Sequence, residues 1–255
     1  MSSNGQQGRR RGAFRVGTSG YQYNHWRRIF YPDDLSREQW FDHYARHFDT
    51  VEINNTFYNL PSEKTFDHWR DKAPRGFLFV LKFSRYGSHL KRLKDPGGTI
   101  GVFLERARRL GEQLGPVLVQ LPPHWNANPD RLSNFLEHAP RDLRWAVEFR
   151  DPSWLCEDVY ELLRAHNAAL VIHDMIPDHP RVCTADWTYL RFHGASAEGD
   201  YTSQALTAWA ARIRDLLAGG RDVYAYFNND VGGYALYNAA DLMRFVQQAD
   251  TREGD

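Results

Sequence analysis

The sequence has no excess of charge of either sign, because 32 Lys and Arg residues balance 32 Asp and Glu residues in a chain of 255. A formal net charge of zero removes any global argument for binding to nucleic acid or to a membrane surface, although a local basic cleft is compatible with it. Long hydrophobic runs are also missing, and none approaches the roughly 20 apolar residues that a membrane helix needs. We therefore expect a protein without a membrane partner.

Cysteine is scarce, with only Cys156 and Cys183 in the chain. Neither residue lies in a CxxC motif or at the Cys/His spacing of a metal site, so we expect two free thiols in a reducing compartment. The N-terminal residues lack the apolar segment of a secretory signal peptide. Together these absences predict a cytoplasmic protein.

The overall composition is that of a globular protein, with 42% hydrophobic and 25% charged residues. A chain of this length suits one (β/α)8 barrel. Residues 1–13 are rich in Gly, Gln, Ser and Arg and cannot bury apolar surface, which predicts a mobile basic tail. We expect one domain over residues 14–249 and a frayed end over 250–255.

Short β-rich runs alternate with helical stretches along the whole domain. The eight predicted strands are Phe14–Ser19, Thr50–Asn54, Phe77–Phe83, Pro116–Leu121, Leu143–Phe149, Ala168–His173, Thr188–His193 and Asp222–Asn228. The predicted helices are Arg37–Phe48, Ser62–Ala73, Thr99–Leu114, Pro129–His138, Ser153–His166, Ser203–Ala218 and Asn238–Gln248. Such alternation indicates parallel strands with helical crossovers.

A closed eight-stranded barrel explains this count better than an open sheet does. Gly17-Thr18-Ser19-Gly20 after the first strand is not the GxGxxG of a dinucleotide-binding sheet, and the chain has no Walker motif. The link from His173 to Thr188 lacks a long helical pattern, which makes the sixth unit irregular. We predict a single TIM-barrel-like (β/α)8 domain.

Seven of the predicted strands end in charged or amide side chains. These residues are Glu52 and Asn54, Lys82, Gln120, Glu148 and Arg150, His173, Arg191 and His193, and Asn228. Because alternate side chains of a strand share a face, each pair points to the same side of its strand. Catalytic residues of β/α barrels lie at the C-terminal strand ends, so the pattern predicts one polar pocket there.

Several of these polar strand ends run directly into aromatic loops. The blocks are Gly17–Trp26, Glu52–Pro61, Gln120–Pro123, Glu148–Trp154, Phe192–Gly194 and Tyr224–Gly233. In this order, from about Val16 to Val246, they resemble the YecE-like family, known as domain of unknown function 72. The resemblance implies a (β/α)8-type barrel with a distant architectural likeness to metal-dependent apurinic endonucleases and sugar isomerases. It implies no reaction, so function is inferred from the site.

The charges of the predicted pocket favour a small anionic or sugar-like ligand. Lys82, Arg150 and Arg191 outnumber Glu52 and Glu148, and the arginine fork suits phosphate and carboxylate groups. The first hypothesis is an enzyme acting on a phosphorylated or sugar-containing ligand by acid/base chemistry.

Each predicted site residue has a role in this hypothesis. Glu148 and His193 transfer protons with Lys82 as a further catalytic partner, Arg150 and Arg191 hold the anion, and Asn54 and Asn228 orient it. The other candidates for ligand binding are Tyr21, Glu52, Tyr58, Gln120, His173 and Asp230. Ser19 and Ser84 are expected to be turn or capping residues.

Three alternatives remain open on the sequence alone. The first is a non-catalytic nucleic-acid-binding protein, whose bases stack on Tyr21, Tyr23, Trp26, Tyr58, Trp125 and Trp154. The second is a metal-dependent phosphoesterase or isomerase with ligands from Glu52, Glu148, His173, Asp174 and His193. We expect no cofactor, because the neighbouring cations compete with a divalent metal for the carboxylates. The third is a self-contained salt-bridge network that only closes the barrel.

Overall fold

The computed structural model describes residues 10–194 and 199–248. Of the predicted N-terminal tail only residues 10–13 are described, and the predicted C-terminal end, residues 250–255, lies outside the described residues. The Arg10 guanidinium is 2.9 Å from the Asp222 carboxylate, and the Gly12 amide donates to the Leu217 carbonyl. The last residues before the barrel are therefore joined to strand β8 (Asp222–Phe227) and helix α7 (Ser203–Ala218).

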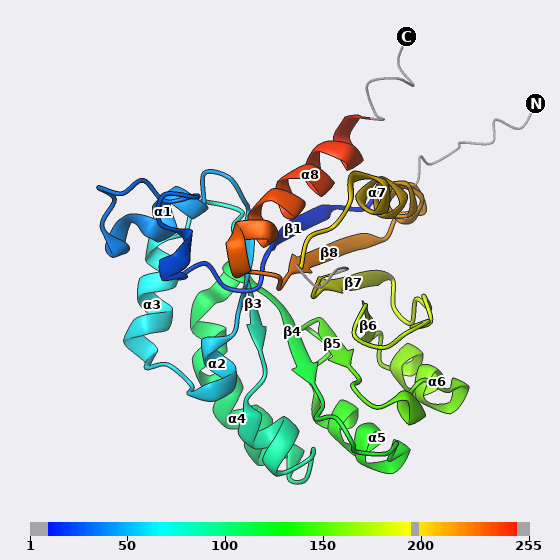
Figure 1. The fold of residues 1–255 in the computed structure, drawn as a ribbon. Coiled ribbons are helices and arrows are strands. Elements are labelled where there is room, and N and C mark those ends of the chain that lie inside the picture. Colours follow the sequence, from blue (N-terminus) through cyan, green and yellow to red (C-terminus); the bar gives the residue numbers. More distant parts are fainter. Residues whose placement is uncertain (1–9, 195–198, 249–255) are drawn as a thin grey trace, which may run out of the picture.

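Eight parallel strands form one nearly closed barrel in the order β1-β8-β7-β6-β5-β4-β3-β2, with helices around the outside (Figure 1). The strands are β1 (Phe14–Thr18), β2 (Thr50–Ile53), β3 (Leu78–Lys82), β4 (Leu114–Gln120), β5 (Trp145–Glu148), β6 (Ala169–His173), β7 (Trp187–Phe192) and β8 (Asp222–Phe227). The predicted fold class is confirmed, and each predicted strand overlaps an observed one, with differences of one or two residues at the ends.

The helices lie where the apolar spacing predicts them, with differences at their ends. They are α1 (Trp40–Tyr44), α2 (Asn55–Tyr58), α3 (Glu63–Lys72), α4 (Pro96–Ala107), α5 (Pro129–His138), α6 (Glu157–Ala165), α7 (Ser203–Ala218) and α8 (Tyr234–Gln248). Short α2 is absent from the predicted set. Helix α4 begins earlier than predicted, because Asp95 caps it in a left-handed conformation and Pro96 follows at the first helical position.

The described chain holds no helix between β6 and β7, as predicted for the sixth unit. None of the described helices combines the length and the apolar character needed to span a membrane.

The barrel closes between β1 and β2 through few backbone contacts. These strands share one isolated bridge, Ser19 with Glu52, and the Gly20 amide donates to the Glu52 carbonyl. Gly17 permits the close approach, because an added Cβ there would collide with the Thr50 carbonyl oxygen. Tyr44 of α1 supplies a further link between the two strands, because its hydroxyl is hydrogen-bonded to the backbone of both Thr18 and Thr50.

Strand alternation separates two apolar layers. Side chains such as Val51, Val119 and Phe227 pack outward against the helices in the larger core. The barrel interior holds the other set, which pairs large rings of β7 and β8 with small residues of β5 and β6: Trp187, Tyr189, Tyr224, Tyr226, Ala146 and Ala169. The polar strand ends continue this interior set, so they converge at the C-terminal end of the strands, here called the barrel mouth.

Candidate functional site

Arg191 is the centre of a buried ion cluster at the barrel mouth. Its side chain, 1% exposed, lies between two fully buried carboxylates: Nη2 is 2.7 Å from Glu52 Oε1 and Nη1 is 2.6 Å from Glu148 Oε2. Burial raises the pKa of both glutamates, but the Arg191 charge together with the neighbouring hydrogen bonds and cations outweighs it and lowers the pKa of Glu52 and, further, of Glu148. Both carboxylates are therefore ionised, and both are committed to the same guanidinium.

Two neutral hydroxyl groups also donate hydrogen bonds to the Glu52 carboxylate. The Tyr189 hydroxyl donates to Oε2 at 2.5 Å, and the Ser19 hydroxyl donates to Oε1. Asn54 in turn donates to Ser19 Oγ at 2.9 Å, while its own Oδ1 is buried without a hydrogen-bond partner in the described chain. Ser19, expected to be a turn residue, is thus part of the charged cluster.

A chain of contacts leads from Glu148 to Asp174. Arg150 is ion-paired with Glu148, and its Nη2 is 3.1 Å from His193 Nε2. His193 Nδ1 is 3.2 Å from Asp174 Oδ1, and the Tyr201 hydroxyl donates to Asp174. Because a guanidinium only donates, His193 accepts at Nε2 and carries its proton at Nδ1.

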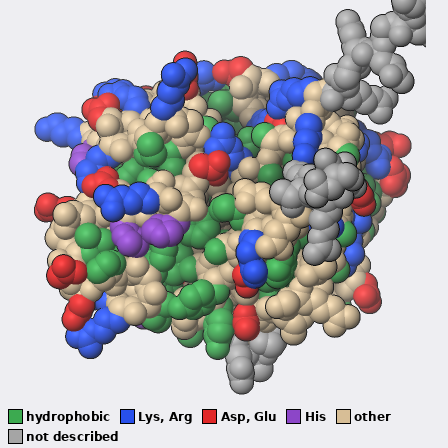
Figure 2. All heavy atoms as spheres, turned by 90° about the horizontal axis from the view of Figure 1, so that it is seen from above, with side chains coloured by type: hydrophobic (Ala, Val, Ile, Leu, Met, Phe, Trp, Pro, Cys, Tyr) green, Lys and Arg blue, Asp and Glu red, His purple; other side chains and the backbone are tan. Residues whose placement is uncertain are grey.

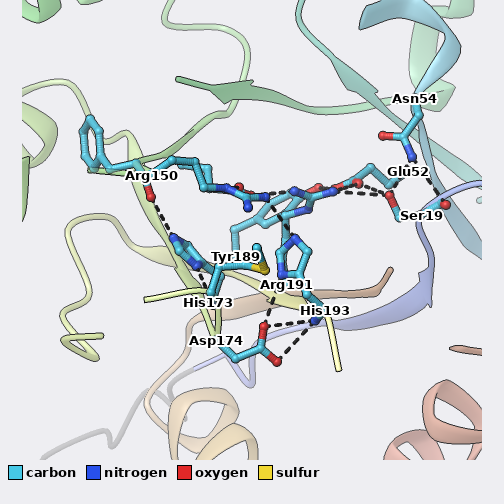
Figure 3. A network of polar contacts seen from close by, with 12 residues as sticks. Ser19, Glu52, Asn54, Arg150, His173, Asp174, Tyr189, Arg191 and His193 are labelled. Atoms are coloured by element: carbon cyan, nitrogen blue, oxygen red, sulfur yellow. Dashed lines mark hydrogen bonds and ion pairs between the residues drawn. The ribbon is translucent and has the colours of Figure 1, made fainter. Parts of the chain in front are cut away.

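These contacts form one continuous group, here called the Arg191 network (Figure 3). The network consists of Ser19, Glu52, Asn54, Glu148, Arg150, Asp174, Tyr189, Arg191 and His193. It joins strands β1, β2, β5, β6 and β7 or the residues that follow them. Strand ends distant in sequence therefore meet, as the sequence predicts.

His173 lies beside the network in a neutral form. Its Nε2 is 2.8 Å from the Phe149 carbonyl, and its Nδ1 accepts from the Met175 amide at 3.1 Å. This pairing requires one protonated and one free ring nitrogen. Burial lowers the pKa of His173 to about 4, in agreement with that geometry.

Lys82 at the end of β3 differs from the other charged residues of the strand ends, which are ion-paired. It is 8% exposed, and its ammonium has neither an ion pair nor a hydrogen bond within the described residues. Nζ lies 4.3 Å from the centroid of the Phe57 ring, and the Phe57 and His89 rings pack edge to face with their centroids 4.9 Å apart. Burial, together with the charge of Arg191, lowers the pKa of Lys82 to about 8.

His89 reaches this position from an unusual element, the π-helix Tyr86–Leu90. π-Helical turns are rare and are frequent at functional sites. Burial, and next the charge of Lys82, lowers the pKa of His89 to about 4, so the imidazole is neutral at pH 7. The charge of Arg150 also acts on both groups, which places Lys82, His89 and Arg150 in one electrostatic neighbourhood.

Besides Lys82 and His173, five predicted site residues form no hydrogen bond or ion pair with the Arg191 network in the part of the chain that is described. Gln120 and Asn228 are half-buried at the ends of β4 and β8. Tyr21 is 5% exposed and packs on Phe41 and Tyr44.

The other two of these five residues lie away from the strand ends. Tyr58 ends helix α2 with its side chain 76% exposed. The Asp230 carboxylate is 3.3 Å from His25 Nε2.

The aromatic residues expected to line the opening are mostly core residues. Trp26 and Trp154 are fully buried, and each indole N–H donates to a backbone carbonyl, that of Asp230 and of Trp125 respectively. Trp125 is 9% exposed. These rings therefore do not provide the open stacking surface expected for bases, because their polar edges are already satisfied inside the fold.

The donor set does not suit a divalent metal. Within residues 10–194 and 199–248 no group of three or more His, Cys, Asp and Glu side chains is arranged to hold a metal ion. The two buried carboxylates are ion-paired with Arg191, and His173 uses both ring nitrogens on the backbone.

A groove opens beside the network where the sixth unit lacks its helix. It encloses about 680 Å³ and is lined by residues including His173, Asp174, His179, Arg191, Tyr201 and Trp209. The sequence pattern gives no signal for Tyr201 or His89, because neither ends a strand. Tyr189 could have been found, since it alternates with Arg191 and His193 on β7.

The sequence profile of the family described as "Protein of unknown function DUF72" matches residues 15–254. The chain belongs to the DUF72 family. It is similar to the UPF0759 protein YunF of Bacillus subtilis, with 23% identity across 85% of this chain and 89% of that protein. It is also similar to the UPF0759 protein YecE of Escherichia coli K12, with 32% identity across 46% of this chain and 43% of that protein.

Solved DUF72 structures share the fold. A DUF72 family protein from Thermotoga maritima superposes with a TM-score of 0.81 at 29% identity, covering 92% of this chain and 99% of its own. One from Enterococcus faecalis V583 superposes with a TM-score of 0.74 at 21% identity, covering 91% and 95% respectively. The predicted family is thereby confirmed, together with its barrel.

Proposed function

We propose that this DUF72 protein is an enzyme that acts on a small phosphorylated or sugar-containing anionic ligand at the barrel mouth. The observation that carries the proposal is the Lys82 side chain, which is 8% exposed and whose ammonium has no ion pair or hydrogen bond among the described residues. Among the nearly buried groups, Lys82, Arg150 and Arg191 give three positive charges, and Glu52 and Glu148 give two negative ones. The Asp174 carboxylate, whose pKa is lowered, is 30% exposed and contacts His193 and Tyr201 rather than Lys82. Burying a charge without a counter-ion is costly, so an anionic ligand would stabilise the site.

Arg150 is the group best suited to bind the ligand's anionic end. Its side chain is 15% exposed, whereas that of Arg191 is 1% exposed and enclosed by two carboxylates. Glu148 orients the Arg150 Nε side, which leaves the Nη side directed toward His193. The fork is thus held in place before a phosphate or carboxylate arrives.

Asp174 and His193 form the proton-transfer pair of the proposed mechanism. Asp174 accepts a hydrogen bond from the protonated Nδ1 of His193, so the lone pair of the imidazole is at Nε2. An anion that takes the hydrogen bond of Arg150 Nη2 releases this lone pair to act as a general base. Glu148, assigned from the sequence to proton transfer, instead orients two arginines in this proposal.

A small ligand is favoured over a polyanion. On the face over α1, α7 and α8, Lys and Arg side chains are interspersed with Asp and Glu, without an extended area of one sign (Figure 2). The tryptophans expected to stack on bases are buried. Both observations argue against a nucleic-acid groove in the regions they cover.

The proposal is tested by screening phosphorylated sugars and sugar acids for thermal stabilisation of the protein, followed by calorimetry and turnover assays on the hits. We expect Arg150→Gln to weaken binding by about tenfold or more, the value of one charge-assisted contact. We expect His193→Asn to retain binding and to lose about 100-fold or more in turnover.

Arg108→Gln is the matched control, because Arg108 is a half-exposed arginine paired with Asp142 on the surface. It should change neither affinity nor rate. Equal losses in the Arg108 and Arg150 variants, or no hit that depends on Arg150, would overturn the proposed function.

A further inference from the structure

The surroundings of Lys82 differ from those of a lysine that serves only as a charge. Among the described residues, Glu52 and Glu148 are the carboxylates that act on the pKa of Lys82. Both are paired with arginines, and neither forms an ion pair with Nζ. The side chain instead extends over the Phe57 ring in a site closed to 8% exposure. After burial, the Arg191 guanidinium is the largest influence against a positive charge on Lys82; Glu52 and Glu148 favour that charge, and Arg150 opposes it more weakly.

These are the conditions that make a lysine amine nucleophilic. Desolvation and neighbouring cations both favour the neutral amine, whose lone pair is the reactive group. At pH 7 the neutral fraction of an amine with a pKa of about 8 exceeds that of an ordinary lysine by about two orders of magnitude. The low exposure of the side chain also limits its contact with bulk water, which hydrolyses an imine.

We infer that Lys82 condenses with the aldehyde or ketone group of the substrate, which makes the substrate class an anionic carbonyl compound such as an oxo acid or a phosphorylated aldose or ketose. This inference rests on the proposed function, because Arg150 binds the anionic end while Lys82 reacts with the carbonyl carbon.

The covalent step balances without an oxidant or a reductant. The amine lone pair forms the C–N bond, and the carbonyl oxygen becomes the hydroxyl of a carbinolamine. That oxygen then leaves as water together with the two amine hydrogens, and an imine remains. Proton movements to and from the oxygen are the acid/base task assigned to His193 and Asp174.

The experiment traps the imine with a hydride donor. The full-length protein is incubated at pH 7 and pH 8 with glyoxylate, pyruvate or dihydroxyacetone phosphate in the presence of sodium cyanoborohydride, and peptide masses are then measured. Each trapped adduct adds the mass of the carbonyl compound less one oxygen atom. We expect labelling of Lys82 to be about tenfold or more faster than that of Lys64, an exposed lysine of α3.

Lys82→Met and Lys82→Arg should both abolish this adduct, and the arginine variant keeps the positive charge if the methionine variant alters the fold. Lys64→Met is the matched control and should leave the Lys82 adduct unchanged. Labelling of Lys82 at the same rate as Lys64, or no adduct at all, would overturn the inference.

Calorimetry with the same three probes separates this failure from that of the proposed function. If a probe still binds in an Arg150-dependent manner without forming an adduct, only the carbonyl chemistry is wrong. If no probe binds and no Arg150-dependent ligand is found by the wider screen, both proposals fail.

Discussion

Lys82 shows how a single side chain in this barrel carries a cost to stability. In the unfolded chain its amine has an ordinary pKa, and burial in the folded state lowers that pKa to about 8. A folded state that disfavours the charged form is destabilised at pH 7, by up to about 3 kcal/mol for a shift of this size. Sites that keep such a residue commonly exchange stability for function.

We therefore expect Lys82→Met to raise the free energy of unfolding at pH 7 by about 1–3 kcal/mol, because the apolar side chain removes an unpaired buried charge. Urea denaturation and calorimetric melting measure this change. Lys64→Met, at an exposed position of α3, should alter stability by less than about 0.5 kcal/mol. A Lys82→Met protein less stable than the parent would show that the ammonium is stabilised by contacts other than those seen.

Arg191 has the opposite role, since it neutralises two buried carboxylates. Removing one partner of a buried ion cluster leaves the others uncompensated, at a cost of about 3–5 kcal/mol. We expect this loss for Arg191→Met in urea denaturation. Adding Glu52→Gln should recover part of it, because Glu148 retains Arg150 while Glu52 loses the one arginine that pairs with it among the described residues. An Arg191→Met loss below about 1 kcal/mol would contradict the buried-cluster account.

Among the secondary-structure elements, α1 takes part in closing the barrel. The Tyr44 hydroxyl accepts from the Thr18 amide of β1 at 3.0 Å and donates to the Thr50 carbonyl of β2 at 3.1 Å. It thereby bridges the two strands at the point where the backbone ladder is reduced to one bridge. A helix side chain replaces part of the missing sheet pairing.

Tyr44→Phe tests this contribution without changing the ring, which packs against Tyr21 and Phe48. We expect a loss of about 1–3 kcal/mol in unfolding free energy, because a buried amide and a buried carbonyl lose their partner. Hydrogen exchange of the Thr18 amide should accelerate in the same variant. Unchanged exchange at Thr18 would show that β1 and β2 are held together by other contacts.

The network also makes the stability of the whole molecule depend on pH. The pKa of His173 is lowered from 6.5 to about 4 by burial, so the unfolded chain binds the extra proton first as the pH falls. A lowered folded-state pKa contributes stability that is present above pH 6.5 and is lost as the pH falls toward 4. The two glutamates, whose pKa values also lie below 4.5, contribute a further loss only at lower pH.

We expect unfolding free energy to fall by about 1–3 kcal/mol more in the parent than in His173→Gln between pH 6.5 and 4.5. The glutamine amide can donate to the Phe149 carbonyl and accept from the Met175 amide, but it does not titrate in this range. Urea denaturation at several pH values measures both slopes. Parallel slopes in the two proteins would assign the pH dependence to other groups, His89 foremost.

The sequence alone determined the strand positions, the barrel and the inward direction of the polar strand ends. These follow from alternation with a period of two residues, which is a local property of each segment. Its weakest predictions concern helix ends and short elements, such as α2, since caps and single turns carry little periodic signal.

Only the tertiary structure decided which of the polar side chains at the strand ends form ion pairs with one another. Closure of the barrel brings Arg191 of β7 against Glu52 of β2 and Glu148 of β5. Both carboxylates are thereby used, and Lys82 has no ion pair within residues 10–194 and 199–248. It also buries the tryptophans and recruits Tyr201 and His89 from segments without a strand pattern. Such partnerships depend on distances between segments far apart in the chain, whereas local residue order fixes only the direction in which each side chain points.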